Sequence, residues 1–131
     1  MKTKRNLIYL VLATIVVVRA GAVVQIGNIT LATADQQNIQ YGSWTATSFT
    51  TGSSDSYLQT VHLMMNDALD TSGFFTVYVY SHDTADGGKP GSPIPNGTLS
   101  GPANPSVEAG YSYSPSTTLT LSANTDYWVV A

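Results

Sequence analysis

The heptapeptide FFTVYVY, Phe74–Tyr80, decides the fold class that this sequence predicts. It consists only of aromatic and β-branched residues, which favour extended strands over helices. In a strand its side chains alternate, which places Val77 and Val79 on one face and Tyr78 and Tyr80 on the other. The heptapeptide therefore predicts a β-strand with one aliphatic face and one aromatic face.

Period-two alternation of apolar and polar residues recurs along the chain between clusters of Gly, Pro, Asn, Asp and Ser. It predicts further strands over Val23–Leu31, Trp44–Thr50, Tyr57–Met65, Val107–Tyr113, Thr117–Leu121 and Asp126–Ala131. Loops are expected over residues 34–41, 52–55, 81–95 and 101–105. Short strands at this spacing, without helices between them, predict an all-β fold, a single antiparallel β-sandwich or jelly-roll-like domain.

One of these strands, Tyr57–Met65, also fits a helix, since Leu58, Val61 and Met65 fall at positions i, i+3 and i+7. As a strand, the segment instead buries Val61 and Met65 on one face and turns His62 outward. We favour the strand, because the neighbouring segments all have strand patterns.

Residues 1–22 have the three parts of a secretory signal peptide. A basic start is followed by an apolar run, Leu7–Val18, and by small residues at Ala20 and Ala22. As a helix, the run would rise about 18 Å, short of the ~30 Å hydrocarbon core of a bilayer. We predict cleavage near Ala20 or Ala22, with an uncleaved N-terminal anchor as the alternative, and no other membrane insertion. The mature domain, residues 23–131, would be secreted or held at the cell surface.

The predicted processing leaves a strongly acidic domain. Four of the five Lys and Arg residues lie in the leader, so Lys89 alone remains against eight Asp and Glu residues, a formal charge of −7. Nucleic acids and anionic membranes are expected to be poor partners, because their binding requires Lys and Arg beside phosphates. The chain has no cysteine, which excludes disulfides, thiolate metal sites and cysteine nucleophiles.

Candidate catalytic and metal-binding residues follow the heptapeptide. Ser81, His82 and Asp83 are the residue types of a hydrolase triad, but triad members converge from separate segments, and the chain has no Gly-x-Ser-x-Gly elbow. Asp83 and Asp86 could supply oxygen ligands to a structural calcium ion, the one cofactor considered, although their spacing is not that of an EF-hand loop. We expect a plain turn here and no enzyme.

Aromatic residues are the more suggestive feature, with eight Tyr and two Trp in the chain. Tyr78 and Tyr80 could form an exposed strip on which a sugar ring stacks. The opposing interpretations place this face in the core and turn the valines outward, or cover both faces of the strand. Trp44 and Trp128 are expected to anchor the core rather than to contact a ligand.

Several sequence blocks resemble, in order, those of the choice-of-anchor R domain. They are Thr47–Gly52, Leu58, Val61–Leu63, Val77–Tyr80, Gly88–Ser92 and Leu119–Val130. The most specific block is SANTDYWVV, Ser122–Val130, and the resemblance spans roughly residues 23–131. It implies a bacterial surface or secreted β-sandwich-like domain, attached through varied C-terminal sorting signals and without an assigned activity. Because the sequence stops in mid-strand at Ala131, we expect a C-terminally incomplete member.

The sequence thus predicts a non-catalytic exported domain with a structural, display or adhesive role, whose partner is a glycan or a surface or matrix protein. The alternative is a carbohydrate-binding module that uses Tyr78 and Tyr80. A third hypothesis is a fragment of a secreted hydrolase with catalytic residues beyond Ala131.

Overall fold

The computed structural model shows an all-β chain. It describes the backbone of residues 9–19, 22–26 and 37–38, and both backbone and side chains of residues 44–65, 76–103, 107 and 109–131. The described residues contain no helix, which confirms the predicted fold class. The strands are β1 (Tyr9–Arg19), β2 (Ala22–Ile26), β3 (Gln37–Asn38), β4 (Ala46–Thr50), β5 (Ser56–Met65), β6 (Val77–Asp83), β7 (Lys89–Ser100), β8 (Ala109–Pro115), β9 (Leu119–Leu121) and β10 (Asp126–Val130).

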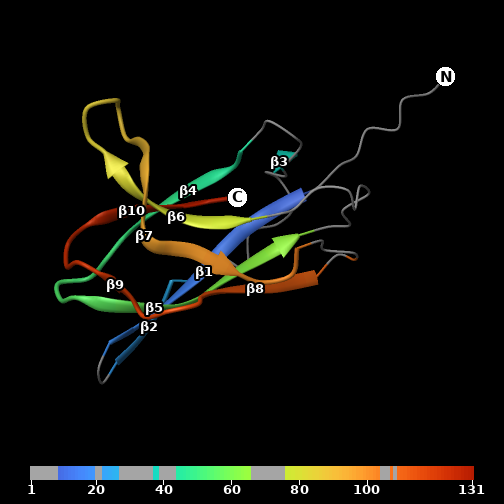
Figure 1. Cartoon of the computed structure of the whole chain (residues 1–131), viewed down its shortest axis with the longest axis horizontal. Helices are drawn as coiled ribbons and strands as arrows, with labels where there is room; N and C mark the ends of the chain where they lie inside the picture. Colours follow the sequence, from blue (N-terminus) through green and yellow to red (C-terminus); the bar gives the residue numbers. More distant parts are fainter. Residues whose placement is uncertain are drawn as a thin grey trace.

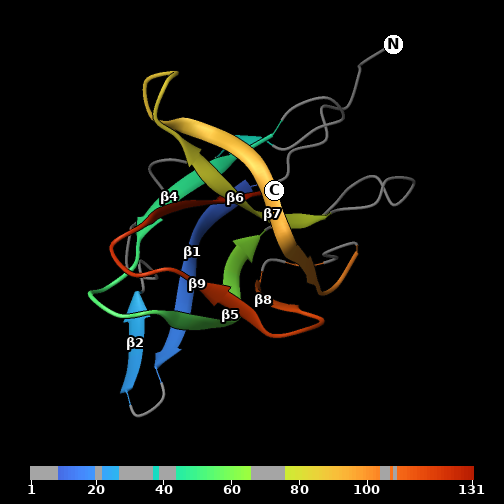
Figure 2. The same cartoon turned by 60° about the vertical axis from the view of Figure 1, so that its left-hand side comes forward.

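The strands form one antiparallel sheet that curls over on itself. Their order is β2-β1-β5-β8-β7-β6-β10-β4, with β3 paired to β1 and β9 paired to β5. Figures 1 and 2 show β4, β6 and β10 on one side of the molecule and β5 and β8 on the other. The curl therefore gives two layers, the arrangement of a β-sandwich.

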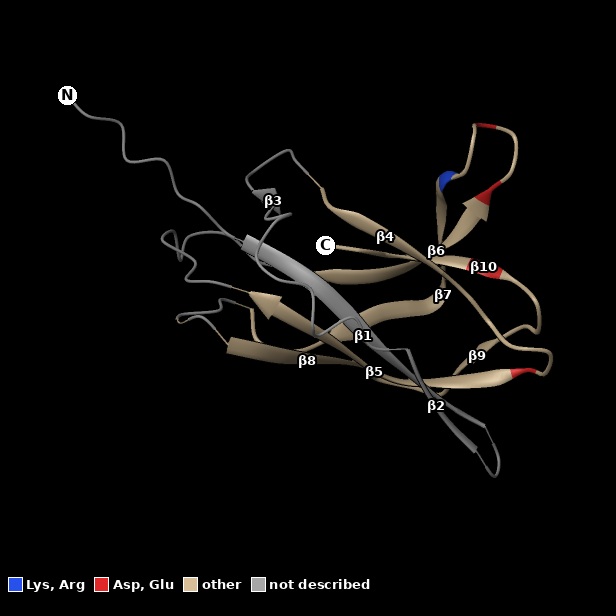
Figure 3. Cartoon of the chain, turned by 180° about the vertical axis from the view of Figure 1, so that it is seen from behind, with Lys and Arg blue, Asp and Glu red and all other residues tan. Residues whose placement is uncertain are grey.

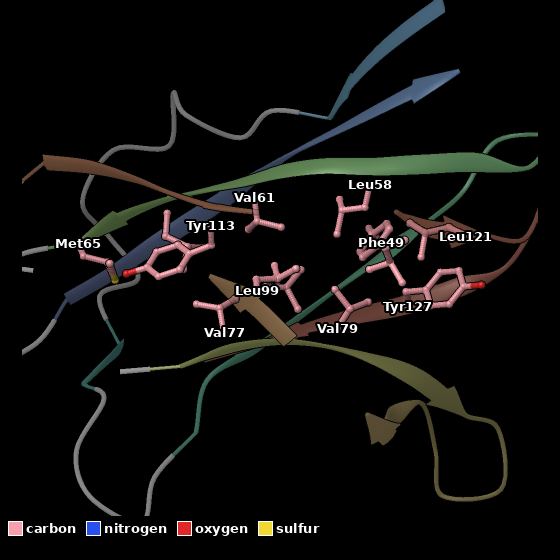
Figure 4. Close-up of a cluster of buried hydrophobic side chains, with 13 residues drawn as sticks. Phe49, Leu58, Val61, Met65, Val77, Val79, Leu99, Tyr113, Leu121 and Tyr127 are labelled. Atoms are coloured by element: carbon pink, nitrogen blue, oxygen red, sulfur yellow. The ribbon is translucent and has the colours of Figure 1, made fainter. Parts of the chain in front are cut away.

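The core lies between these two layers. Figure 4 shows Leu58 and Val61 of β5 facing Val77 and Val79 of β6. Both valines of β6 are completely buried, as the heptapeptide predicts. Burial of each such aliphatic side chain stabilises the fold by about 2 kcal/mol. The cluster consists of Phe49, Leu58, Val61, Leu63, Met65, Val77, Val79, Leu99, Tyr113, Leu119, Leu121, Tyr127 and Val129. Phe74 and Phe75 lie outside the described residues.

Strand β5 confirms the strand interpretation of residues 57–65 and explains the competing helical pattern. Leu58 and Val61 both face the core although they are three positions apart. The pairing of β5 with β1 shifts by one residue between Leu58 and Thr60. Such a β-bulge reverses the alternation of the strand. The apparent helical spacing therefore comes from a bulge.

Strand β7 corrects the expectation of a loop over residues 81–95. The stretch contains three prolines, which normally interrupt a sheet. However, only Leu99 and Ser100 of β7 pair with β8, so the rest of β7 has β6 as its single neighbour. Proline is tolerated on such an edge, because its nitrogen need not donate a hydrogen bond to a second strand.

Strand β1 falls within the predicted signal segment. It pairs with β5 from Leu10 opposite Met65 to Val18 opposite Tyr57, so residues 9–19 belong to the sheet of the unprocessed chain. Cleavage near Ala20 or Ala22 stays a prediction. Strand β2 coincides with the start of the predicted strand 23–31, whose remaining residues lie outside the described part.

Strand β10 lies inside the sheet, between β6 and β4. The backbone N–H and carbonyl of Ala131 both bond to Thr45, at 2.9 Å. The turn before β10 carries residues 122–125, and the Thr125 N–H donates to Oγ1 of buried Thr51 at 2.9 Å. The most specific part of the sequence resemblance therefore fixes a turn against the end of β4.

Candidate binding face

The outer face of the layer formed by β4, β6 and β10 carries the aromatic side chains that the sequence singled out. On β6, Tyr78 and Tyr80 are partly exposed, whereas the alternating valines are buried. The tyrosines therefore point away from the core, which is the orientation that a ligand-binding strip requires. Across the sheet, Trp128 of β10 lies opposite Tyr80 and also opposite Ser48 of β4.

The rings on this side, here called the aromatic face, are those of Trp44, Tyr78, Tyr80, His82 and Trp128. The Tyr80 ring lies 6.3 Å from the Tyr78 ring in an edge-on arrangement and 6.3 Å from the Trp44 ring at a tilt of 53°. Trp44 is 69 % exposed. Aromatic pairs at such distances attract one another, so the rings hold each other in place.

Trp128 and His82 form a second pair of rings on this face, joined to each other by a hydrogen bond between neighbouring strands. The indole N–H of Trp128 donates to Nδ1 of His82 at 3.1 Å. Their ring planes differ by only 11°, and the ring centroids are 6.2 Å apart. Both residues are partly exposed.

The expectation that Trp44 and Trp128 anchor the core is therefore wrong. Phe49 is the residue of β4 that enters the core, and Trp44 precedes that strand. On β10, the buried residues Tyr127 and Val129 flank Trp128, which faces the other way. Alternation along β10 places Trp128 on the face opposite the buried Tyr127 and so predicts its outward orientation. The general preference of tryptophan for burial predicts the opposite, and it is wrong here.

The candidate calcium residues lie in the hairpin between β6 and β7. Oδ1 of Asp83 accepts a hydrogen bond from the Ala85 N–H at 2.8 Å, and Asp86 forms an ion pair with Lys89 at 2.9 Å. Each carboxylate thus has its own protein partner. Among the described residues, no three His, Asp or Glu side chains are grouped as metal ligands. The calcium site stays a prediction.

Ser81, His82 and Asp83 do not contact one another as a triad would. Oγ of Ser81 accepts a hydrogen bond from the Ser92 N–H at 3.1 Å, and His82 bonds to Trp128. A second side-chain pair, His62 and Ser112, was not predicted from the sequence, because the contact between them depends on the register of β5 against β8. Nδ1 of His62 lies 2.9 Å from Oγ of Ser112, across β5 and β8 in the opposite layer.

Charged side chains avoid the middle of the strands in the described part of the chain. Figure 3 shows the backbone positions of the charged residues at the β6–β7 hairpin, at the start of β10 and just before β5. Lys89, in that hairpin, is paired with Asp86. The carboxylate of Asp126 lies at the border of the aromatic face, and its Oδ1 accepts a hydrogen bond from the Thr50 hydroxyl. The face is therefore apolar in its centre and polar or acidic at its border.

In the portion of the chain with described structure, no helix has the length and apolar character needed to cross a membrane. Comparisons of the chain with protein-family models, with curated proteins and with solved structures found no match. The resemblance to the choice-of-anchor R domain therefore stays a prediction from the sequence motifs.

Proposed function

We propose that this chain is a non-catalytic, exported adhesive domain that holds neutral glycans on its aromatic face. The observation that carries the proposal is the outward orientation of Tyr78 and Tyr80, opposite the buried valines of β6. The C–H groups of a sugar ring stack on exposed aromatic rings, and neighbouring polar groups bond to its hydroxyls. Ser48 and Asp126 supply such groups beside Trp128.

The charge distribution favours a neutral ligand. Lys89 is the one basic residue after the leader, and its ammonium is engaged by Asp86. An acidic polysaccharide or a nucleic acid would find carboxylates and no available cation on the described surface near the aromatic face. A surface or matrix protein is the second candidate partner, and the glycan experiment below separates the two.

Replacing Tyr80 with alanine is expected to weaken glycan binding about tenfold, because this ring contacts both the Tyr78 and Trp44 rings. The wild-type protein is first tested by calorimetry against neutral hexasaccharides of glucose, mannose and N-acetylglucosamine and against acidic hyaluronate and polygalacturonate fragments. Tyr80→Ala and Tyr78→Ala are then titrated with the strongest neutral ligand.

The matched control is Tyr57→Ala, which removes a 46 % exposed tyrosine from β5 in the opposite layer and should leave affinity unchanged. Unaltered affinity in Tyr80→Ala would contradict the proposed face. Binding to no glycan would favour a protein partner. Shortened oligosaccharides after incubation would instead support the hydrolase hypothesis.

Export makes a separate prediction. When the full-length gene is expressed in a bacterial host, the chain recovered from the medium or the cell surface should begin at residue 21 or 23, as measured by intact mass. This result follows from the small residues Ala20 and Ala22 after the apolar run. A cytoplasmic chain of unaltered mass would contradict the predicted location.

A further inference from the structure

Three rings of the aromatic face point in different directions. Trp44 precedes β4, and β10 separates β4 from β6, yet the Trp44 ring lies 6.3 Å from the Tyr80 ring of β6 at a tilt of 53°. The Tyr78 ring lies at 87° to the Tyr80 ring, also at 6.3 Å. A flat surface therefore cannot lie face to face with Tyr80 and with either of its two neighbours at the same time.

The backbone beside Trp44 is fixed to the sheet. The next residue, Thr45, exchanges two backbone hydrogen bonds of 2.9 Å with Ala131, which follows β10. The Trp44 side chain is nevertheless strongly exposed, whereas the other four residues of the aromatic face are only partly exposed. Trp44 is thus the ring of this face that is most accessible to a ligand.

The orientation of the rings decides which physical form of a glycan can bind. The surface of a crystalline polysaccharide is flat, so several aromatic rings can stack on it together only when they are coplanar. A single glycan chain can rotate about its glycosidic bonds, and successive sugar residues can then stack on rings of different tilt. A monosaccharide can stack flat on only one ring of a tilted pair.

We infer that the aromatic face binds a single neutral glycan chain, soluble or amorphous, with separate sugar residues on Trp44 and Tyr80. Crystalline polysaccharide, which can lie flat against only one of these two rings, binds much more weakly. The inference rests on the proposed function and deepens it, because it assigns the physical form of the ligand and adds Trp44 to the binding residues.

The test compares different physical forms of one sugar, that of the strongest neutral hexasaccharide in the panel. Its polymer is prepared in a crystalline form and in a swollen, amorphous form, and depletion of the protein from solution measures binding per accessible surface area. We expect the amorphous polymer to bind about tenfold more tightly than the crystalline one. In calorimetry, the hexasaccharide should bind at least about tenfold more tightly than the monosaccharide, since only the longer ligand contacts two rings.

Trp44→Ala removes the most exposed ring of the face and should weaken binding of the hexasaccharide about tenfold. Trp44→Tyr keeps an aromatic ring and should retain most of the affinity. Tyr57→Ala, which removes an exposed ring from the opposite layer, is the matched control and should bind like the wild type. Trp44 is not part of the core cluster, so thermal unfolding should show all three variants to be folded.

The outcomes separate this inference from the proposed function. Equal binding to the crystalline and amorphous polymers, or equal affinities for the monosaccharide and the hexasaccharide, would overturn the single-chain ligand. Unaltered affinity in Trp44→Ala would overturn the role of Trp44. In each of these cases, weaker binding by Tyr80→Ala would still support the aromatic face. Failure of every form of every glycan to bind would overturn both the inference and the proposed function.

Discussion

Replacing Gly101 with alanine is expected to lower the free energy of unfolding by about 3 kcal/mol. A Cβ atom at this position would lie 2.3 Å from Cδ1 of Tyr113 and 2.7 Å from the backbone oxygen of Ser112. The Tyr113 ring is 1 % exposed, and its hydroxyl donates to the carbonyl of Pro102 at 2.8 Å. Neither the ring nor the backbone can yield without disturbing the core, so the extra methyl group overpacks it.

Urea unfolding of purified Gly101→Ala and Gly110→Ala measures this effect against a matched control. A Cβ at Gly110, also on this side of the molecule in β8, would meet only the Met64 sulfur, at 3.3 Å. A thioether is flexible and adapts to small intrusions, so Gly110→Ala should stay within about 0.5 kcal/mol of the wild type. Equal stabilities of the two variants would mean that the Tyr113 ring is not confined as described.

The fold class was predictable because the decisive information is local. The alternation of the heptapeptide requires no knowledge of partner strands, and Val77 and Val79 are buried as it predicts. The sequence of β5 fits both a strand and a helix, because its pairing with β1 alters the local alternation. Leu58 and Val61 gave a helical spacing because a bulge opposite β1 reverses the phase between them.

Strand β7 could not be predicted from its own residues. Proline and glycine in this stretch indicate a loop when taken alone. Whether proline is tolerated in a strand depends on whether a second neighbour needs its hydrogen bond, and that follows from the order of strands in the sheet. The order is a property of the whole chain.

The part of the candidate site that lies within one strand was predictable, whereas the part that depends on the pairing of two strands was not. The shared outward face of Tyr78 and Tyr80 follows from alternation within one strand. The hydrogen bond from Trp128 to His82 follows from the register of β10 against β6, in which Trp128 lies opposite Tyr80. Residues 46 positions apart carry no local signal of such a contact.

The stability of the protein is expected to fall steeply in alkali, with Tyr113 as a principal cause. Burial raises the pKa of Tyr113 above its ordinary value, and the neighbouring Tyr111 raises it further. The unfolded chain releases the phenolic proton near pH 10, while the folded protein retains it. The contribution of this group is therefore complete below about pH 10 and is lost as the pH rises toward the folded-state pKa, by up to about 1.4 kcal/mol per pH unit.

Tyr113→Phe separates this effect from general alkaline unfolding. The variant keeps the buried ring but loses the hydrogen bond to Pro102, so at pH 7 it should be about 1 kcal/mol less stable than the wild type. Because phenylalanine cannot ionise, its stability should depend less on pH than that of the wild type above pH 10. Urea unfolding at half-unit steps from pH 8 to pH 11.5 measures both slopes.

Tyr57→Phe serves as the control, since this tyrosine is 46 % exposed and its removal should leave the wild-type slope in place. If Tyr113→Phe and the wild type lost stability in parallel above pH 10, the alkaline loss would have to arise from groups other than Tyr113. If instead the two curves converge as the pH rises, the buried phenol opposes unfolding only while it keeps its proton. The Tyr113 hydroxyl, which donates a hydrogen bond to the Pro102 carbonyl at neutral pH, is then the group whose ionisation destabilises the core in alkali.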